Sequence, residues 1–205
     1  MEKSVYGKKY RVALVFSLAL LAVGSWLDAI STGFSRIIGG GIVLNDLGFH
    51  LIAFHSWYPY VADGLLVLAD IVFLAYVFYE KSYGDLPFYI ACMALFQVFR
   101  SAILPLTPLA TPIVSHGFGF LGSVLTIGGT FPSGHAGQVF TLFFVTPWKH
   151  RSLKYVMLAL ALLESFFMIA GRGHYTIDVV ASFFITFFIY TIASRYWEKM
   201  KPTLL

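Results

Sequence analysis

Long apolar runs alternate with short polar segments along the chain. A helix needs about 20 mostly apolar residues to cross the hydrocarbon core of a bilayer. On this measure the pattern predicts an all-α, polytopic membrane protein with six transmembrane helices, of which the fourth is short enough to begin in the interface. Pro132, Pro147 and Gly171 punctuate the last three runs. The predicted helices cover residues 12–30, 61–79, 87–106, 133–147, 154–171 and 174–194.

Composition supports the same fold class. Hydrophobic residues make up 59% of the 205 residues and charged residues only 12%, whereas a soluble domain has about 25% charged residues. The length suits one domain, so residues 1–205 are interpreted as a single unit. The single cysteine, Cys92, excludes an intramolecular disulfide. The first apolar run lacks a small-residue cleavage site, which favours a retained helix over a signal peptide.

Basic residues predict how the helices are oriented, because Lys and Arg concentrate in cytoplasmic loops. Of the 14 Lys and Arg residues, eleven fall on one predicted side, two fall on the other, and Arg100 lies within the third helix. We therefore predict that both termini are cytoplasmic. The net charge of +4 suits anionic lipid rather than nucleic acid. The eleven are Lys3, Lys8, Lys9, Arg11, Lys81, Lys149, Arg151, Lys154, Arg195, Lys199 and Lys201; the two are Arg36 and Arg172.

A His–Asp pair begins the sixth predicted helix, in the stretch GRGHYTIDVV. His174 and Asp178 are four residues apart, which places them on one face of a helix. Asp178 can accept the proton of one ring nitrogen and so raise the basicity of the other. The free nitrogen would then serve as a nucleophile or a base. The alternative is a structural pair that locks the helix in place.

A second histidine opens the fourth predicted helix, in the stretch GTFPSGHAGQ. Proline is accepted in the first turn of a helix, and Thr130 is a candidate cap. Ser133 and Gly134 are predicted to present backbone N–H groups to an anion at the positive end of the helix dipole. His135 could protonate a leaving oxygen there. A plain proline–glycine helix start is the alternative.

Two arginines would supply positive charge at the same membrane depth. Arg100 falls in the outer third of the third helix, where it needs an anionic partner, water or a route to the interface. Arg172 lies in the short turn before His174, and an ordinary surface arginine is its alternative. The sequence has no H-E-x-x-H motif and no cysteine cluster, so we expect no metal and no other cofactor.

At these residues the chain resembles the type 2 phosphatidic acid phosphatase superfamily of lipid phosphatases and phosphotransferases. PSGH at 132–135 is similar to its second motif, HYTID at 174–178 is similar to its third, and the resemblance covers about 60–195. The phosphatase pattern has a lysine where Met93 stands, a proline where Ser101 stands and an arginine where Met168 stands. Arg172 two residues before His174, with FRSAILPLTPL and LNDLGFHLI, looks instead like the sphingomyelin synthase branch.

The resemblance implies a phosphotransferase whose site faces the extracytoplasmic side. His174, oriented by Asp178, would attack the phosphorus of a phospholipid and form a phosphohistidine. Arg100, Arg172 and the amides around Ser133 would bind the phosphate oxygens, while His135 protonates the departing lipid alcohol. Ceramide or diacylglycerol would then accept the headgroup phosphate.

Three further polar residues are candidates for the cavity or for contact with a choline or ethanolamine headgroup: Asp63, Asp70 and Tyr175. Helix–helix hydrogen bonds are the alternative for the aspartates. At the level of the whole protein, a lipid phosphatase or phospholipase C-like hydrolase remains open, as does a non-catalytic membrane protein on the same fold. The sequence leaves the headgroup, the acceptor and a homo-oligomeric state open.

Overall fold

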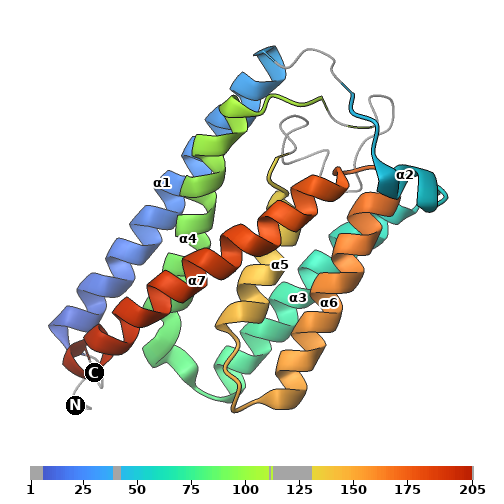
Figure 1. The fold of residues 1–205 in the computed structure, drawn as a ribbon. Helices are drawn as coiled ribbons and strands as arrows, with labels where there is room; N and C mark the ends of the chain where they lie inside the picture. Colours follow the sequence, from blue (N-terminus) through green and yellow to red (C-terminus); the bar gives the residue numbers. More distant parts are fainter. Residues whose placement is uncertain (1–6, 39–42, 111, 113–130, 205) are drawn as a thin grey trace.

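The computed structural model describes residues 7–38, 43–110, 112 and 131–204, and this part of the chain is helical with no strand (Figure 1). Both termini lie at the same end of the molecule. The bounds of the helices are α1 Lys8–Ile38, α2 Leu47–Leu51, α3 Tyr58–Tyr79, η1 Ser82–Asp85, α4 Leu86–Ile103, η2 Leu104–Leu106, α5 Gly134–Val145, α6 Arg151–Ala170 and α7 Thr176–Leu204.

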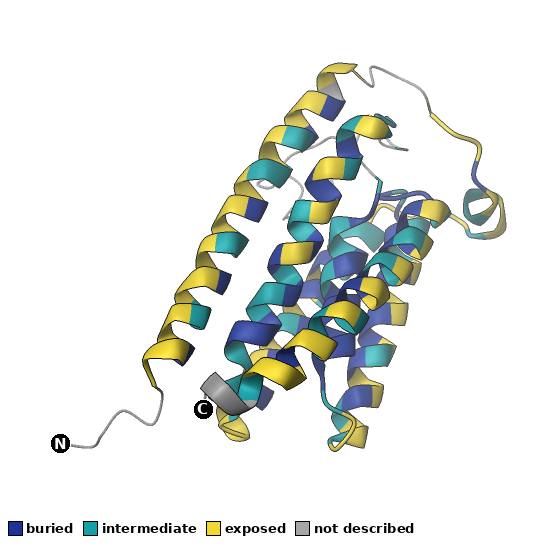
Figure 2. Cartoon of the chain, turned by 60° about the vertical axis from the view of Figure 1, so that its left-hand side comes forward, coloured by how far each residue is buried: buried dark blue, intermediate teal, exposed yellow. Residues whose placement is uncertain are grey.

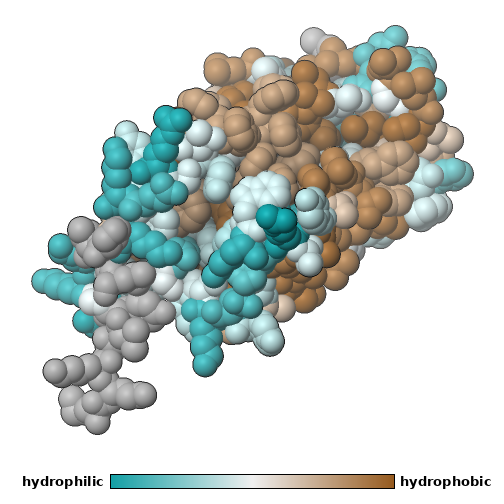
Figure 3. Space-filling model, turned by 60° about the horizontal axis from the view of Figure 1, so that its bottom comes forward, coloured by the Kyte–Doolittle hydropathy of each residue, from teal (hydrophilic) through white to brown (hydrophobic). Residues whose placement is uncertain are grey.

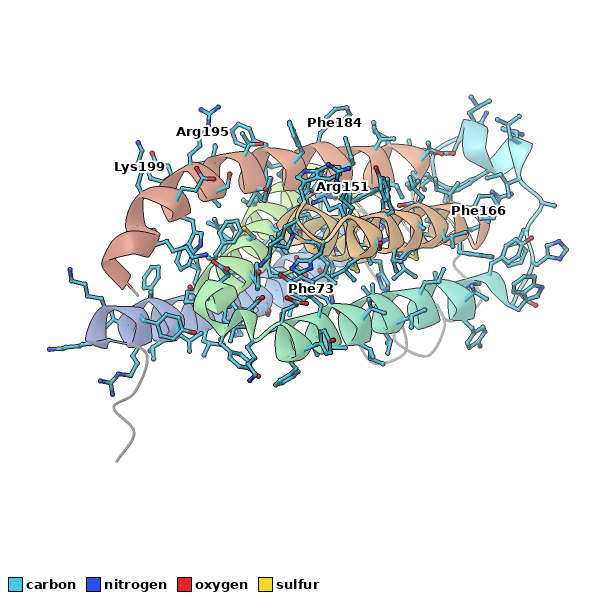
Figure 4. All side chains as sticks on the ribbon, turned by 90° about the horizontal axis from the view of Figure 1, so that it is seen from below. Phe73, Arg151, Phe166, Phe184, Arg195 and Lys199 are labelled. Carbon is cyan, nitrogen blue, oxygen red and sulfur yellow. The ribbon has the colours of Figure 1, made fainter. Side chains whose placement is uncertain are left out.

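Five helical segments of the described residues are long and apolar enough to cross a membrane. Their length and composition indicate an integral membrane protein. They comprise residues Lys8–Ser35, Tyr58–Tyr79, Ser82–Leu106, Arg151–Ala170 and Thr176–Lys201. Phe166 and Phe184, on α6 and α7, are exposed apolar side chains, whereas Arg195 and Lys199 project from the C-terminal part of α7 (Figure 4). Hydrophobic residues cover much of the surface in Figure 3, and hydrophilic residues gather toward one end.

The fourth predicted span is a helix, but a short one. α5 has 12 residues, which corresponds to about 18 Å against the roughly 30 Å of a hydrocarbon core. It lies between α6, α7, α4 and α3 rather than at the surface, and nine of its residues are buried. A helix surrounded by other helices does not need to span the bilayer to bury its apolar side chains.

A buried lysine explains how α5 can end inside the bundle. Lys154 on α6 donates from Nζ to the carbonyl oxygens of Phe143, Phe144 and Thr146, at 2.5, 3.0 and 2.8 Å. The last carbonyl oxygens of a helix have no N–H donor within the helix. A cation placed there donates to them and complements the helix dipole. Our count of basic residues had treated Lys154 as a loop residue; the structure places it in α6, only 2% exposed.

α1 is attached to α4 along a polar stripe rather than an apolar one. Ser17 Oγ donates to the Pro87 carbonyl at 2.9 Å, and Ser35 Oγ donates to the Leu104 carbonyl at 2.7 Å. Between them Gly24 lies so close to α4 that an added Cβ would be 3.1 Å from the Ala94 carbonyl oxygen. Small polar residues of this kind let two membrane helices approach closely. The rest of α1 is largely exposed (Figure 2).

The contact between α4 and α5 sets the height of the site. A Cβ on Gly137 would overlap the ring of Phe96, so only glycine admits that ring against α5. Phe96 lies one helical turn before Arg100, and Gly137 follows His135 by two residues. The same close approach therefore brings Arg100 to the first turn of α5.

Candidate functional site

The His–Asp pair forms at the start of α7, and its geometry differs from two residues on one helix face. His174 precedes the helix, which begins at Thr176, and Asp178 lies in the first turn. His174 Nδ1 lies 3.2 Å from Asp178 Oδ2, which also accepts the backbone N–H of Tyr175 at 3.0 Å. Asp178 is fully buried. With Nδ1–H donating to the carboxylate, Nε2 carries the lone pair available for chemistry.

The charge state of His174 follows from its burial. The side chain is buried, and this burial lowers the pKa of His174 below its usual value. The hydrogen bond to Asp178 raises the pKa and only partly offsets the effect, while His135 and Arg100 add to the lowering. The ring is therefore neutral at pH 7, as a nucleophile must be.

His135 has a carboxylate partner that the sequence did not reveal. It is the second residue of α5, and its Nε2 lies 3.2 Å from Asp63 Oδ1 on α3. Asp63 is buried, 3% exposed. The ring centroids of His135 and His174 are 6.5 Å apart. Two histidines, each paired with its own carboxylate, thus face one region. Asp63, predicted as a headgroup or cavity residue, contacts a histidine instead.

The N-terminus of α5 is joined to α7 through Ser133. Its side chain caps α5 by accepting the N–H of Ala136 at 3.2 Å. Its own N–H donates to the Asp178 carbonyl at 3.1 Å, and Ser182 Oγ donates to the Ser133 carbonyl at 2.8 Å. The Ser133 N–H is therefore engaged, which corrects the expectation that it points freely at an anion. Thr130, the other candidate cap, lies outside the described residues.

The anion-binding capacity of this helix start rests on the next two amides. Gly134 and His135 open α5, and the first N–H groups of an α-helix have no acceptor within the helix. They lie at the positive end of the helix dipole. The guanidinium of Arg100 lies beside this turn, since a Cβ on Gly134 would be in van der Waals contact with its carbon at 3.4 Å.

Arg100 is held between α1 and α5. Its Nε donates to the Pro132 carbonyl at 2.9 Å, and its Nη1 forms an ion pair with both carboxylate oxygens of Asp28 on α1. The arginine is buried, 7% exposed. The structure thus brings Arg100 to the helix start that carries His135, as the membrane depths predicted, and supplies an acidic partner in Asp28.

Arg172 and Tyr175 have structural partners near α2. Arg172 Nη2 donates to the carbonyls of Phe49 and Ile52 at 2.6 and 2.8 Å, and the guanidinium lies 4.4 Å from the Phe49 ring centroid. Within the described residues its buried Nη1 has no hydrogen-bond partner. Tyr175 is fully buried and donates to the Ala110 carbonyl at 3.0 Å, so it is a packing residue rather than an open cavity residue.

Asp46 ties the segment before α2 to the start of α7. It caps α2 by accepting the Gly48 N–H at 2.8 Å. It also accepts the Thr176 N–H at 2.8 Å and the Thr176 hydroxyl at 2.6 Å. Since Thr176 follows His174 by two residues, this bond braces the turn that carries the histidine.

Two further acidic side chains lie in the bundle interior. Gln138 on α5 donates to both carboxylate oxygens of Asp70 at 2.9 and 2.8 Å, so Asp70 forms a helix–helix hydrogen bond. Glu164 on α6 is fully buried, repels Asp63 electrostatically, and has no hydrogen-bond partner within the described residues. Glu164 was not among the predicted site residues, although a lone acidic residue inside an apolar helix is the signal that could have identified it.

The donor set suits phosphoryl chemistry. No group of three or more His, Cys, Asp or Glu residues in the described ranges could hold a metal ion. A neutral histidine with a free nitrogen, a second histidine opposite it and a helix N-terminus beside an arginine can instead attack, protonate and bind a phosphate.

Comparison with known proteins points to the same chemistry. Residues 131–195, which carry His135, His174 and Asp178, match the family model described as PAP2 superfamily C-terminal. The match covers less than half of the chain, and Arg100, Asp63 and Asp28 lie outside it. No curated protein matches the chain. Proteins of that superfamily are generally phosphatases or phosphotransferases, so the match supports an enzyme acting on lipid phosphates. In the segment that bears its two histidines, this membrane protein is similar to the C-terminal domain of the PAP2 superfamily.

Proposed function

We propose that the protein moves the headgroup phosphate of a phospholipid to a lipid alcohol through a phosphohistidine. The observation that carries the proposal is the pair of histidines, each bonded to a buried carboxylate, with ring centroids 6.5 Å apart. A donor such as a phosphocholine or phosphoethanolamine lipid and an acceptor such as ceramide or diacylglycerol fit this chemistry.

The first displacement forms the covalent intermediate. Nε2 of His174 attacks phosphorus, and the bond between phosphorus and the lipid alcohol oxygen breaks. His135 gives its proton to that oxygen, so the donor leaves as a neutral alcohol. Arg100 and the first amides of α5 stabilise the charge on the equatorial oxygens.

The second displacement releases the product. The acceptor alcohol gives its proton to His135 and attacks the phosphohistidine, and the phosphorus–nitrogen bond breaks. Asp178 retains the tautomer of His174, and Asp63 stabilises His135 while it is protonated. If water replaced the alcohol, the same residues would hydrolyse the lipid.

This chain lacks two cationic residues of the phosphatase pattern, which favours transfer of a phosphodiester over hydrolysis of a phosphomonoester. A phosphomonoester carries about −1.5 to −2 charges near neutrality and a diester about −1. The phosphatase pattern has cationic residues where this chain has Met93 and Met168. Met168 is buried, and its backbone carbonyl accepts the N–H groups of Gly173 and His174, so this position lies next to the turn that carries His174.

Orientation in the membrane belongs to the same proposal. The two histidines lie at the ends of α5 and α7 that are remote from both chain termini (Figure 1). Basic residues of α7 such as Arg195 and Lys199 lie at the opposite end. With the termini cytoplasmic, the site faces the extracytoplasmic side. The segment 131–150 then acts as a sixth crossing, with α5 as its helical part.

Purified protein incubated with headgroup-labelled phospholipid, with and without ceramide or diacylglycerol, tests the proposal. Transfer predicts a labelled new lipid that depends on the acceptor and disappears in His174→Ala. Labelled water-soluble headgroup phosphate without acceptor dependence would mean hydrolysis. No product under any condition would overturn an enzymatic function.

A further inference from the structure

The arginine at the site is shared with a helix that lies outside the matched family region. Asp28 belongs to α1, whose attachment to α4 runs along one buried stripe: Ser17 and Gly24 come before Asp28, and Ser35 comes after it. Along α1 these four residues are separated by seven, four and seven positions, so they lie on one face of the helix. The Asp28 carboxylate is therefore held at a fixed height beside Arg100.

The ion pair places a negative charge within reach of any anion bound to Arg100. Asp28 contacts Nη1 of the guanidinium while Nε is bonded to the Pro132 carbonyl. The guanidinium itself lies against Gly134 in the first turn of α5. An anion bound to the amides of this turn would consequently be separated from the Asp28 carboxylate only by the guanidinium of Arg100.

The carboxylates nearest to the two histidines have partners of their own. Asp63 and Asp178 pair with the histidines. Arg172, the nearest other guanidinium in sequence to the nucleophile, donates to α2 carbonyls. Asp28, in contrast, forms its ion pair with Arg100 directly.

We propose that Asp28 tunes the charge preference of the site: by partly neutralising Arg100, it weakens the binding of a doubly charged phosphomonoester more than that of a singly charged phosphodiester. This rests on the proposed function, because it concerns the phosphate of the same site. Repulsion between Asp28 and a bound phosphate scales with the charge of that phosphate. A phosphomonoester is therefore repelled about twice as strongly as a phosphodiester in the same position. At a separation of about 6 Å and an effective dielectric constant of about 20, one extra charge changes affinity by roughly a hundredfold.

A pair of ligands that differ by one charge tests this directly. Dodecyl phosphate and its methyl ester have the same alkyl chain, and at pH 8 they carry about two charges and one charge. Their binding to purified protein in non-ionic micelles is measured by the shift in melting temperature. In Asp28→Asn the affinity for dodecyl phosphate should rise at least about tenfold relative to that for the methyl ester.

Two control variants separate charge from packing. Asp28→Glu retains the carboxylate and should retain the wild-type preference. Ser35→Ala removes the hydrogen bond from α1 to Leu104 without a change in charge, so the ratio of the two affinities should stay as in the wild type. If Asp28→Asn does not fold, Asp28→Ser serves as the neutral variant.

An unchanged affinity ratio in the neutral variant, or an equal loss of both ligands, overturns the role of Asp28. Because binding is measured without turnover, this result is distinct from failure of the proposed function, which would show as absence of lipid products from the wild type. Where turnover is present, the ratio of monoester hydrolysis to diester transfer should rise in Asp28→Asn in parallel with binding.

Discussion

Asp63 on α3 and His135 on α5 lie 72 residues apart in the chain and 3.2 Å apart in space, between Oδ1 and Nε2. This contact gives the second histidine a buried carboxylate, just as Asp178 serves the first. An imidazole that is protonated in mid-reaction is stabilised by such a neighbour. The site therefore has two histidine–carboxylate pairs rather than one.

Removal of His174, the proposed nucleophile, should abolish turnover without unfolding the protein. His174→Ala is expected to reduce transfer by at least about a thousandfold, since it removes the ring that is hydrogen-bonded to Asp178. Asp178→Asn should reduce kcat more than it raises KM, because it disturbs the tautomer of His174. Labelled-lipid kinetics measure both, and melting temperature serves as the folding control. Near-normal rates in either variant would contradict the mechanism.

Asp63→Asn should impair proton transfer by His135. The rate of transfer is expected to fall by about ten- to a hundredfold for a natural alkyl leaving group. A donor with a nitrophenyl leaving group needs little protonation, so its rate should fall far less. Comparison of the two donors in one variant measures the effect. An equal loss for both would assign Asp63 to substrate binding or folding instead.

The pH dependence of kcat/KM should report His174. Its pKa is lowered by burial, and only the neutral ring is nucleophilic, so the acid limb should lie below the usual histidine pKa of about 6.5, with activity lost as pH falls through it. Asp178 raises that pKa. In Asp178→Asn the acid limb of the residual activity should therefore move to still lower pH, and a shift to higher pH would contradict the assignment.

The stereochemistry at phosphorus distinguishes two displacements from one. Each in-line displacement inverts the configuration, so a phosphohistidine route gives net retention. A chiral phosphorothioate phospholipid, with the product lipid analysed for configuration, measures this. Net inversion would exclude the covalent intermediate and make His174 a general base.

Lys154 should matter for stability rather than for catalysis. In Lys154→Met the carbonyls of Phe143, Phe144 and Thr146 lose their donor inside the bundle, and we expect a loss of about 2 kcal/mol in the free energy of unfolding. Lys149→Met removes an exposed lysine from the same connection and should change little. Unfolding in detergent measures both. Equal stability of the two variants would refute the capping role.

The sequence predicted best what depends on local spacing. His174 and Asp178 are four residues apart, and Pro-Ser-Gly-His marks a helix start, so the pairing and the helix start could be identified without coordinates. The position of Arg100 near the helix start that carries His135 followed from membrane depth. The helices themselves were also predictable from the apolar runs, and the fourth was expected to be short. Its end at Val145 was not predictable, because the last carbonyls are bound by Lys154 from another helix.

Contacts between helices were the part that the sequence could not supply. Successive helical residues differ by about 100° around the axis, so which side of α3 faces α5 depends on packing. Asp63 and Asp70 were therefore given the same candidate role, although one contacts His135 and the other Gln138. Arg172, predicted to bind phosphate, has a left-handed backbone, φ 58°, and donates to the carbonyls of Phe49 and Ile52.

The bond between the Ser133 N–H and the Asp178 carbonyl joins the start of α5 to the first turn of α7 through peptide groups alone. Every residue except proline has such an N–H group. This link therefore survives replacement of the Ser133 side chain, whereas the cap on the Ala136 N–H does not. Because Ser133 is fully buried, a mutational scan of position 133 should tolerate small residues, at a cost of about 1 kcal/mol for the lost cap, and should reject proline and large side chains. The connection between the two helix starts would then depend on the backbone more than on the chemistry of the side chain at this position.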